Sequence, residues 1–146
     1  MINDLIKVRG ELKLTLSSPQ GNVKQEIIVP NLVVTAGKNL IASRLKDTSD
    51  AAMTHMAIGT GSTAAAAGNT ALGSEAGRVA LTSTTVTTNN VAYVGSFGAG
   101  TGTGAITEAG LLNASSSGTL LCRTVFSVIN KGANDTLGIT WTVTIS

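Results

Sequence analysis

The sequence predicts an all-β protein: a β-sandwich or jelly-roll-like barrel of about eight strands with one short helix near residues 36–47. Apolar and polar residues alternate with period two in several stretches, which is the pattern of half-buried strands. Turn-forming clusters of Gly, Asn and Ser separate these stretches at the spacing typical of a sandwich or barrel. Strand and helix patterns do not alternate as a parallel α/β fold requires. We expect one β domain over residues 1–146.

The first predicted element is a charged β-hairpin. Residues 5–16 alternate, and the turn cluster 17–22 separates them from a second alternating stretch at 23–29. Pro30 ends the pairing because it has no N–H to donate. The apolar face of the first strand holds Val8, Leu12, Leu14 and Leu16, and its polar face includes Lys7, Arg9 and Lys13.

The helix is predicted over residues 35–47, with Thr35 as its N-cap. Leu40, Ile41 and Leu45 cluster on one side of it, so it needs a sheet to pack against. A short apolar strand at 53–58 follows.

Residues 59–77 are rich in Gly, Ala, Ser and Thr and show no strong period. A loop of this length in a compact domain is usually functional or ordered by a partner. The run Ala64 to Ala67 can form a helical turn, because alanine has the highest helix propensity.

From residue 78 onward the pattern is that of strands throughout. The predicted strands span 78–88, 91–97, 105–112, 119–129 and 137–145, with a tight turn at Asn89-Asn90. Leu120, Cys122, Phe126 and Val128 share one phase, which places them in the core. In the last strand Trp141 lies at the centre of the apolar stripe, and the opposite face is nearly all threonine. Such a face fits contact with another surface.

Charge is scarce and unevenly distributed. Gly, Ala, Ser and Thr supply 69 of the 146 residues, the formal net charge is +2, and residues 1–50 hold twelve of the eighteen charges. The other six are Glu75, Arg78, Glu108, Arg123, Lys131 and Asp135. This balance does not indicate a nucleic-acid partner, and no long apolar run or secretory pattern indicates a membrane or export. A charge-poor surface instead fits an assembly subunit, with a neutral soluble β domain as the alternative.

Residues that could perform catalysis are few. His55 and Cys122 are the single histidine and the single cysteine, and the phase of Cys122 fits a core thiol better than a nucleophile. They do not supply a zinc site, which needs three or four ligands. The glycine runs lack the Gly-Lys-Ser/Thr of a phosphate-binding loop. We therefore expect no enzyme activity, no metal and no cofactor.

The remaining acids and aromatic residues suggest structural roles. Glu75 and Arg78 can pair if their stretch is helical, and Glu108 is better explained by a structural salt bridge than by glycosidase chemistry. Tyr93 and Phe97 stay open as an aromatic binding face.

Several segments resemble small virion proteins of tailed bacteriophages. They are Asn31-Leu32-Val33-Val34 with Gly37, residues 50–61, Thr70 to Glu75 with Arg78, and Ile106-Thr107-Glu108-Ala109-Gly110-Leu111. The chain is most similar to capsid cement or decoration proteins of the Bordetella phage type, and relatives also carry tail-fibre labels. The resemblance implies a β-rich homo-oligomer, a dimer or trimer, that binds a major capsid protein in the virion and is made in the host cytoplasm. It implies no catalytic residues.

Three functions follow as hypotheses. The first is a capsid cement subunit, the second is a tail-fibre or baseplate module that contacts a host receptor, and the third is a small β-rich enzyme. Residues 1–30 do not share the resemblance, so the hairpin is either a contact arm or a part of the core. In the first case Lys7, Arg9 and Lys13 are the proposed partner contacts, since charged faces set orientation and specificity.

Overall fold

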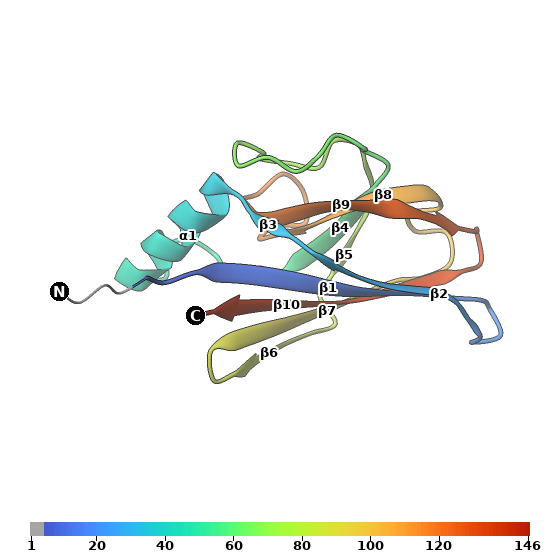
Figure 1. Cartoon of the computed structure of the whole chain (residues 1–146), viewed down its shortest axis with the longest axis horizontal. Coiled ribbons are helices and arrows are strands. Elements are labelled where there is room, and N and C mark those ends of the chain that lie inside the picture. Colours follow the sequence, from blue (N-terminus) through green and yellow to red (C-terminus); the bar gives the residue numbers. More distant parts are fainter. Residues whose placement is uncertain (1–4) are drawn as a thin grey trace.

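The computed structural model describes residues 5–146 and shows an all-β sandwich with a single short helix (Figure 1). Two five-stranded antiparallel sheets face each other, sheet A with the order β2-β1-β10-β7-β6 and sheet B with the order β3-β9-β8-β4-β5. The elements are β1 (Val8–Ser17), β2 (Val23–Pro30), β3 (Leu32–Val33), α1 (Thr35–Lys46), β4 (His55–Gly59), β5 (Glu75–Ala80), β6 (Ser83–Thr87), β7 (Asn90–Phe97), β8 (Gly104–Leu112), β9 (Leu120–Lys131) and β10 (Thr136–Ile145).

Sheet A confirms the predicted N-terminal hairpin and places it inside the sandwich. β1 lies between β2 and β10, and it pairs with β10 along its whole length, from Val8↔Ile145 to Ser17↔Thr136. Its inward residues Leu12 and Leu14 are fully buried. The hairpin therefore completes the core, so any contact role belongs to its outward face alone.

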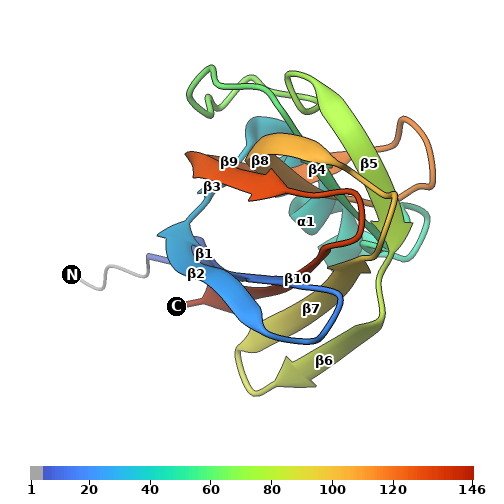
Figure 2. The same cartoon turned by 90° about the vertical axis from the view of Figure 1, so that its right-hand side faces the viewer.

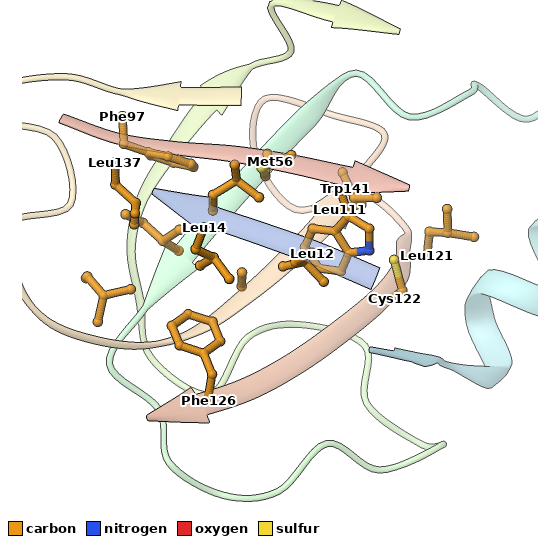
Figure 3. Close-up of a cluster of buried hydrophobic side chains, with 14 of the residues drawn as sticks. Leu12, Leu14, Met56, Phe97, Leu111, Leu121, Cys122, Phe126, Leu137 and Trp141 are labelled. Atoms are coloured by element: carbon orange, nitrogen blue, oxygen red, sulfur yellow. The ribbon is translucent and has the colours of Figure 1, made fainter. Parts of the chain in front are cut away.

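The core fills the space between the two sheets (Figure 3). Trp141 is fully buried at its centre, as the alternation in the last strand predicts. Around it are Leu12, Leu14, Met56, Phe97, Leu111, Cys122, Phe126 and Leu137. Burying an aromatic or leucine side chain of this kind contributes about 1.5–3 kcal/mol.

The outer face of sheet B is covered, whereas the outer face of sheet A is not. A second apolar cluster, Val34, Ala57, Leu72, Leu112 and Leu120, lies beside the main core. Figures 1 and 2 show α1 at one end of the sandwich and the long loop after β4 on the side of sheet B. Across the described residues 5–146, no segment crosses the outer side of sheet A in either view.

The N-cap of the helix lies one residue before the predicted one. Val34 occupies the N-cap and Thr35 is already helical, with no side-chain cap, so the prediction of Thr35 as N-cap is wrong. Gly37 lies directly against the Leu121 backbone, where a Cβ would collide with the carbonyl group. Leu40 is buried in the core, but Leu45 is 86% exposed. The apolar side predicted for the helix is therefore not buried along its whole length.

Pairing between strands distant in the sequence accounts for other differences from the predicted strands and turns. Residues 78–88 form not one strand but parts of two, because the chain crosses between the sheets at Leu81 and Thr82. The tight turn lies at Thr88 and Asn89, one residue early, with the positive φ at Thr88. Val128 is 45% exposed because the β8–β9 register shifts between Ile106 and Glu108, which turns the side chains of β9 out of phase.

Candidate interaction surfaces

The outer face of sheet A presents a broad uncharged area. Along β10 every second residue points outward, and the registers with β7 and β6 continue this surface across three strands. We call it the threonine face; its hydroxyl residues are Thr136, Thr140, Thr142 and Thr144 of β10 with Ser83, Thr85 and Thr87 of β6. None of these residues is buried. The face is polar without charge, so covering it desolvates no ion.

The three proposed partner contacts lie along one side of the threonine face. Lys7 directly precedes β1, and Arg9 and Lys13 lie on the outward side of β1 with the exposed Glu11 between them. Lys13 makes a weak pair with Glu26 of β2, at 3.5 Å between Nζ and Oε1. Lys7 and Arg9 are exposed and have no ion pair within the described residues. We call Lys7, Arg9 and Lys13 the basic row.

A buried ion pair fixes the long loop between β4 and β5. Glu108 of β8 is fully buried, and Arg123 of β9 is 2% exposed. The Arg123 Nε donates to the Glu108 Oε1 at 3.1 Å. The same carboxylate accepts backbone N–H groups from Gly61 and Ser74 on Oε2 and from Gly73 on Oε1, all within 2.7 Å.

These contacts determine the ionisation of Glu108. Burial raises the pKa of Glu108, but the N–H groups of Ser74, Gly73 and Gly61 and the Arg123 guanidinium outweigh it and hold the pKa below its ordinary value of 4.5. The carboxylate is therefore ionised at neutral pH, and each hydrogen bond to it is charge-assisted.

Arg123 holds the rest of the loop. Its Nη1 donates to the Asn69 side chain at 2.9 Å and its Nη2 donates to the Thr63 carbonyl at 3.0 Å. The run Ala64–Ala67 forms no helical turn, in contrast to the prediction. The loop is thus ordered by the chain's own strands without a partner, and the scarcity of charge in residues 51–146 is the one sequence signal that could have found this pair.

The Glu75–Arg78 pair is confirmed, but it forms on strand β5 and not on a helix. Arg78 donates from Nη2 and Nε to the two carboxylate oxygens of Glu75, at 2.7 and 3.0 Å. Its Nη1 also donates to the carbonyl groups of Ala114 and Ser117, so it fixes the β8–β9 connection as well.

Lys131 and Asp135 complete the set of charges beyond residue 50. The Lys131 Nζ donates to the Gly98 carbonyl at 2.8 Å, and its side chain is buried. Asp135 accepts from Lys24 at 2.8 Å and from the Gly132 N–H. All six charges of residues 51–146 are thus engaged in contacts within the fold, so this part of the chain presents a surface almost without available charge.

His55 and Cys122 do not form a catalytic pair. They lie on β4 and β9, which β8 separates in sheet B. Cys122 is fully buried, and burial raises the pKa of its thiol well above the usual value. The His55 Nδ1 lies 2.8 Å from the Thr54 hydroxyl oxygen. Cys122 is a core thiol, as its phase predicts.

The aromatic residues leave no binding platform in the described residues 5–146. Phe97 and Trp141 are fully buried and Phe126 is 8% exposed. Tyr93 is half-buried and packs against the core. An aromatic binding face made of Tyr93 and Phe97 is therefore excluded, because Phe97 is buried and only Tyr93 is partly exposed.

Residues 5–146 contain neither a metal-binding cluster nor a membrane-spanning helix. No group of three or more His, Cys, Asp and Glu side chains is placed to hold a metal ion. No helix in this range has both the length and the apolar character needed to cross a membrane. No family model, no curated protein and no solved structure matches the chain.

Proposed function

We propose that this chain is a structural virion protein, a capsid cement or decoration subunit that binds the outside of an icosahedral phage head and bridges neighbouring major capsid proteins. The observation on which the proposal depends is the threonine face, which is broad, uncovered and without charge. A sheet face of this kind suits contact with another protein, because its hydroxyl groups can find new hydrogen-bond partners and no unpaired ion is buried.

The distribution of charge supports the same proposal. The charges beyond residue 50 stabilise the fold, so the second two-thirds of the chain offers neutral area for self-association and shell contact. Each contact can be weak, because many copies on one shell act together through avidity. A homodimer or homotrimer provides the first level of this multivalency.

The basic row gives the subunit its orientation. Charged groups at the edge of an interface contribute more to register and association rate than to affinity. Arg9 and Lys13 lie on β1 beside the neutral area and Lys7 directly precedes this strand, so they can fix how that area is placed on the partner.

The segments that resemble phage cement proteins also meet in one place. Gly61, Gly73, Ser74 and Glu108 belong to three of those segments, and together with Arg123 they fix the long loop. Their role is structural, which agrees with a proposal that needs no catalytic residue and no cofactor. The inward position of the aromatic residues gives the tail-fibre alternative no aromatic receptor tip.

Co-sedimentation with phage heads tests the proposal. The purified chain is mixed with heads assembled from the major capsid protein encoded beside it, and we expect saturable binding that weakens as salt increases. Changing Lys7, Arg9 and Lys13 together to Glu should leave the fold intact and reduce binding. The single change Arg9→Glu has Lys46→Glu as its control, because Lys46 is also exposed but lies at the end of α1.

Two results would contradict the proposal. Wild-type protein that fails to bind heads at any salt concentration excludes the cement role, and binding to host cells instead favours the tail-fibre alternative. A triple variant that binds heads as tightly as the wild type removes the orienting role of the basic row.

A further inference from the structure

An open groove runs between α1 and the beginning of β1. Residues 6–9 form one wall, and Lys38, Ile41, Ala42 and Leu45 of α1 form the other, around a hollow of about 530 Å³. A second hollow of about 260 Å³ shares Val8, Ile41 and Leu45 with the first and continues toward Tyr93 of β7 and Ile145 of β10. We call the two together the α1 groove; Figure 1 shows α1 beside the start of β1 at this end of the sandwich.

The floor and walls of the α1 groove are apolar and uncovered. Leu45 is 86% exposed and Ile6 is 78% exposed, although both are large hydrophobic residues. Ile145, the cross-strand partner of Val8 in the second hollow, is 43% exposed. Exposed apolar side chains that gather around a hollow and are rimmed by polar groups mark an interaction site.

The rim of the groove is basic. Lys7 and Arg9 on the β1 side and Lys38 and Arg44 on the α1 side line it, and no carboxylate lines either hollow. None of these four cations forms an ion pair within residues 5–146. Arg44 donates to a neutral acceptor, the Asp50 carbonyl oxygen, at 3.0 Å.

The nearby acids of residues 5–146 neutralise this rim only in part. Asp47 pairs with Lys46 at 3.0 Å and also attracts the Arg44 guanidinium. Asp50 lines a separate hollow together with Asn39 and Thr119. Four cations that form no ion pair within residues 5–146 surround an apolar floor, and this combination favours a ligand that is both acidic and apolar.

We propose that the α1 groove binds a short extended segment of a partner protein in which carboxylates alternate with large apolar side chains. From Lys38 to Leu45 the helix rises about 10 Å, which matches about three extended residues. In such a segment successive side chains point to opposite sides, so apolar groups enter the hollows while carboxylates meet the rim. The inference rests on the proposed function, because it specifies what Lys7 and Arg9 meet on the partner.

Methyl NMR spectroscopy with synthetic peptides tests this inference without phage heads, so its failure is distinguishable from failure of the cement role. The probe is a capped hexapeptide of sequence Glu-Leu-Asp-Ile-Glu-Leu. We expect saturable shifts of the Ile41 and Leu45 methyl signals with a dissociation constant below about 1 mM. Two control peptides, one with lysine for each acid and one with serine for each apolar residue, should cause no saturable shift.

Variants of the folded protein locate the site. Leu45→Ser, and Lys38→Glu combined with Arg44→Glu, should each weaken peptide binding about tenfold or more. Val23→Ser and Lys46→Glu are the controls, since both residues are exposed and line neither hollow. The controls should bind like the wild type.

Three results overturn the inference. The first is the absence of saturable shifts at Ile41 and Leu45 up to several millimolar acidic peptide. The second is an equal response to the lysine peptide, which shows that charge does not select the ligand. The third is a shift of the same signals with protein concentration alone, which identifies a second copy of this chain as the occupant.

Discussion

The indole Nε1 of Trp141 donates a hydrogen bond of 2.7 Å to the side-chain oxygen of Asn31. This contact links the centre of β10 to the residue that connects β2 and β3. It gives the largest buried side chain of the core its one polar partner, and the same asparagine amide lies directly over Gly10 of β1. One side chain therefore satisfies the indole and fills the place that a Cβ at residue 10 would occupy.

Trp141→Ala should be severely destabilising. The residue is fully buried, so truncation leaves a large cavity and an unpaired Asn31 oxygen, at a cost of about 3–5 kcal/mol in the free energy of unfolding. Denaturant titration measures this loss. A loss below about 1 kcal/mol would contradict the position of Trp141 in the core. Ile145→Ala, at the half-exposed end of the same strand, is the control and should cost much less.

Gly10→Ala should cost about 1–3 kcal/mol in stability, because the new methyl group would displace the Asn31 amide and break its bond to Trp141. The same substitution in an Asn31→Ala background should cost less, since the obstructing amide is already gone. Denaturant titration of the four proteins in the cycle measures the coupling, which we expect to exceed about 0.5 kcal/mol. Strictly additive effects would show that Asn31 is not the obstacle.

Glu108→Gln should lower stability at neutral pH by about 3–5 kcal/mol, because it leaves Arg123 buried without its counter-ion and turns an amide group toward backbone N–H donors. Glu11→Gln, on the exposed side of β1, is the matched control and should change stability by less than about 0.5 kcal/mol. Hydrogen exchange gives a second measurement: the amides of Gly61, Gly73 and Ser74 should exchange slowly in the wild type and rapidly in the variant.

The same variant should change the response to acid. The folded-state pKa of Glu108 is below its ordinary value of 4.5, so its contribution is complete above that value and is lost as the pH falls through the folded pKa. Unfolding measurements between neutral pH and the acid range should therefore show a smaller loss of stability for Glu108→Gln than for the wild type. Parallel curves for the two proteins would assign the acid sensitivity to other groups, such as Asp135, whose pKa is also lowered.

Deletion of residues 1–29 should prevent folding, because it removes an inner strand of sheet A together with the buried Leu12 and Leu14. Circular dichroism and thermal unfolding should show no cooperative transition. Deletion of residues 1–6 is the control, and it should retain one, because β1 begins at Val8. A folded, cooperative protein that lacks the whole hairpin would show that sheet A closes without β1.

The sequence was most informative where one strand has one buried face. In β1 and β10 the period of two is unbroken, and Leu12, Leu14, Ile139 and Trp141 are buried as it predicts. Prediction failed where contacts between segments distant in the sequence determine which side chains are buried. The register shift that exposes Val128 depends on how β8 pairs with β9, and the local periodicity of β9 carries no information about that pairing.

The same limit applies to the candidate sites. The exposure of Lys7, Arg9 and Lys13 could be predicted, because they alternate with apolar residues. The order in the long loop could not, because residues of β8 and β9 impose it from outside. The α1 groove likewise forms between segments about thirty residues apart, and only the unexplained exposure of Leu45 on the folded helix reveals it.

The place of β10 in sheet A has a consequence for biosynthesis. It is the central strand that joins the β1–β2 hairpin to the β6–β7 hairpin, yet it is the last strand to leave the ribosome. All five strands of sheet B precede it, so that sheet can assemble first. Until β10 is added, the β1–β2 and β6–β7 hairpins of sheet A have unpaired strand edges. Nascent chains in this state expose Leu12 and Leu14, and such surfaces favour aggregation. Because the contacts that close sheet A join β1 to β10, segments far apart in the sequence, we expect folding to be slow.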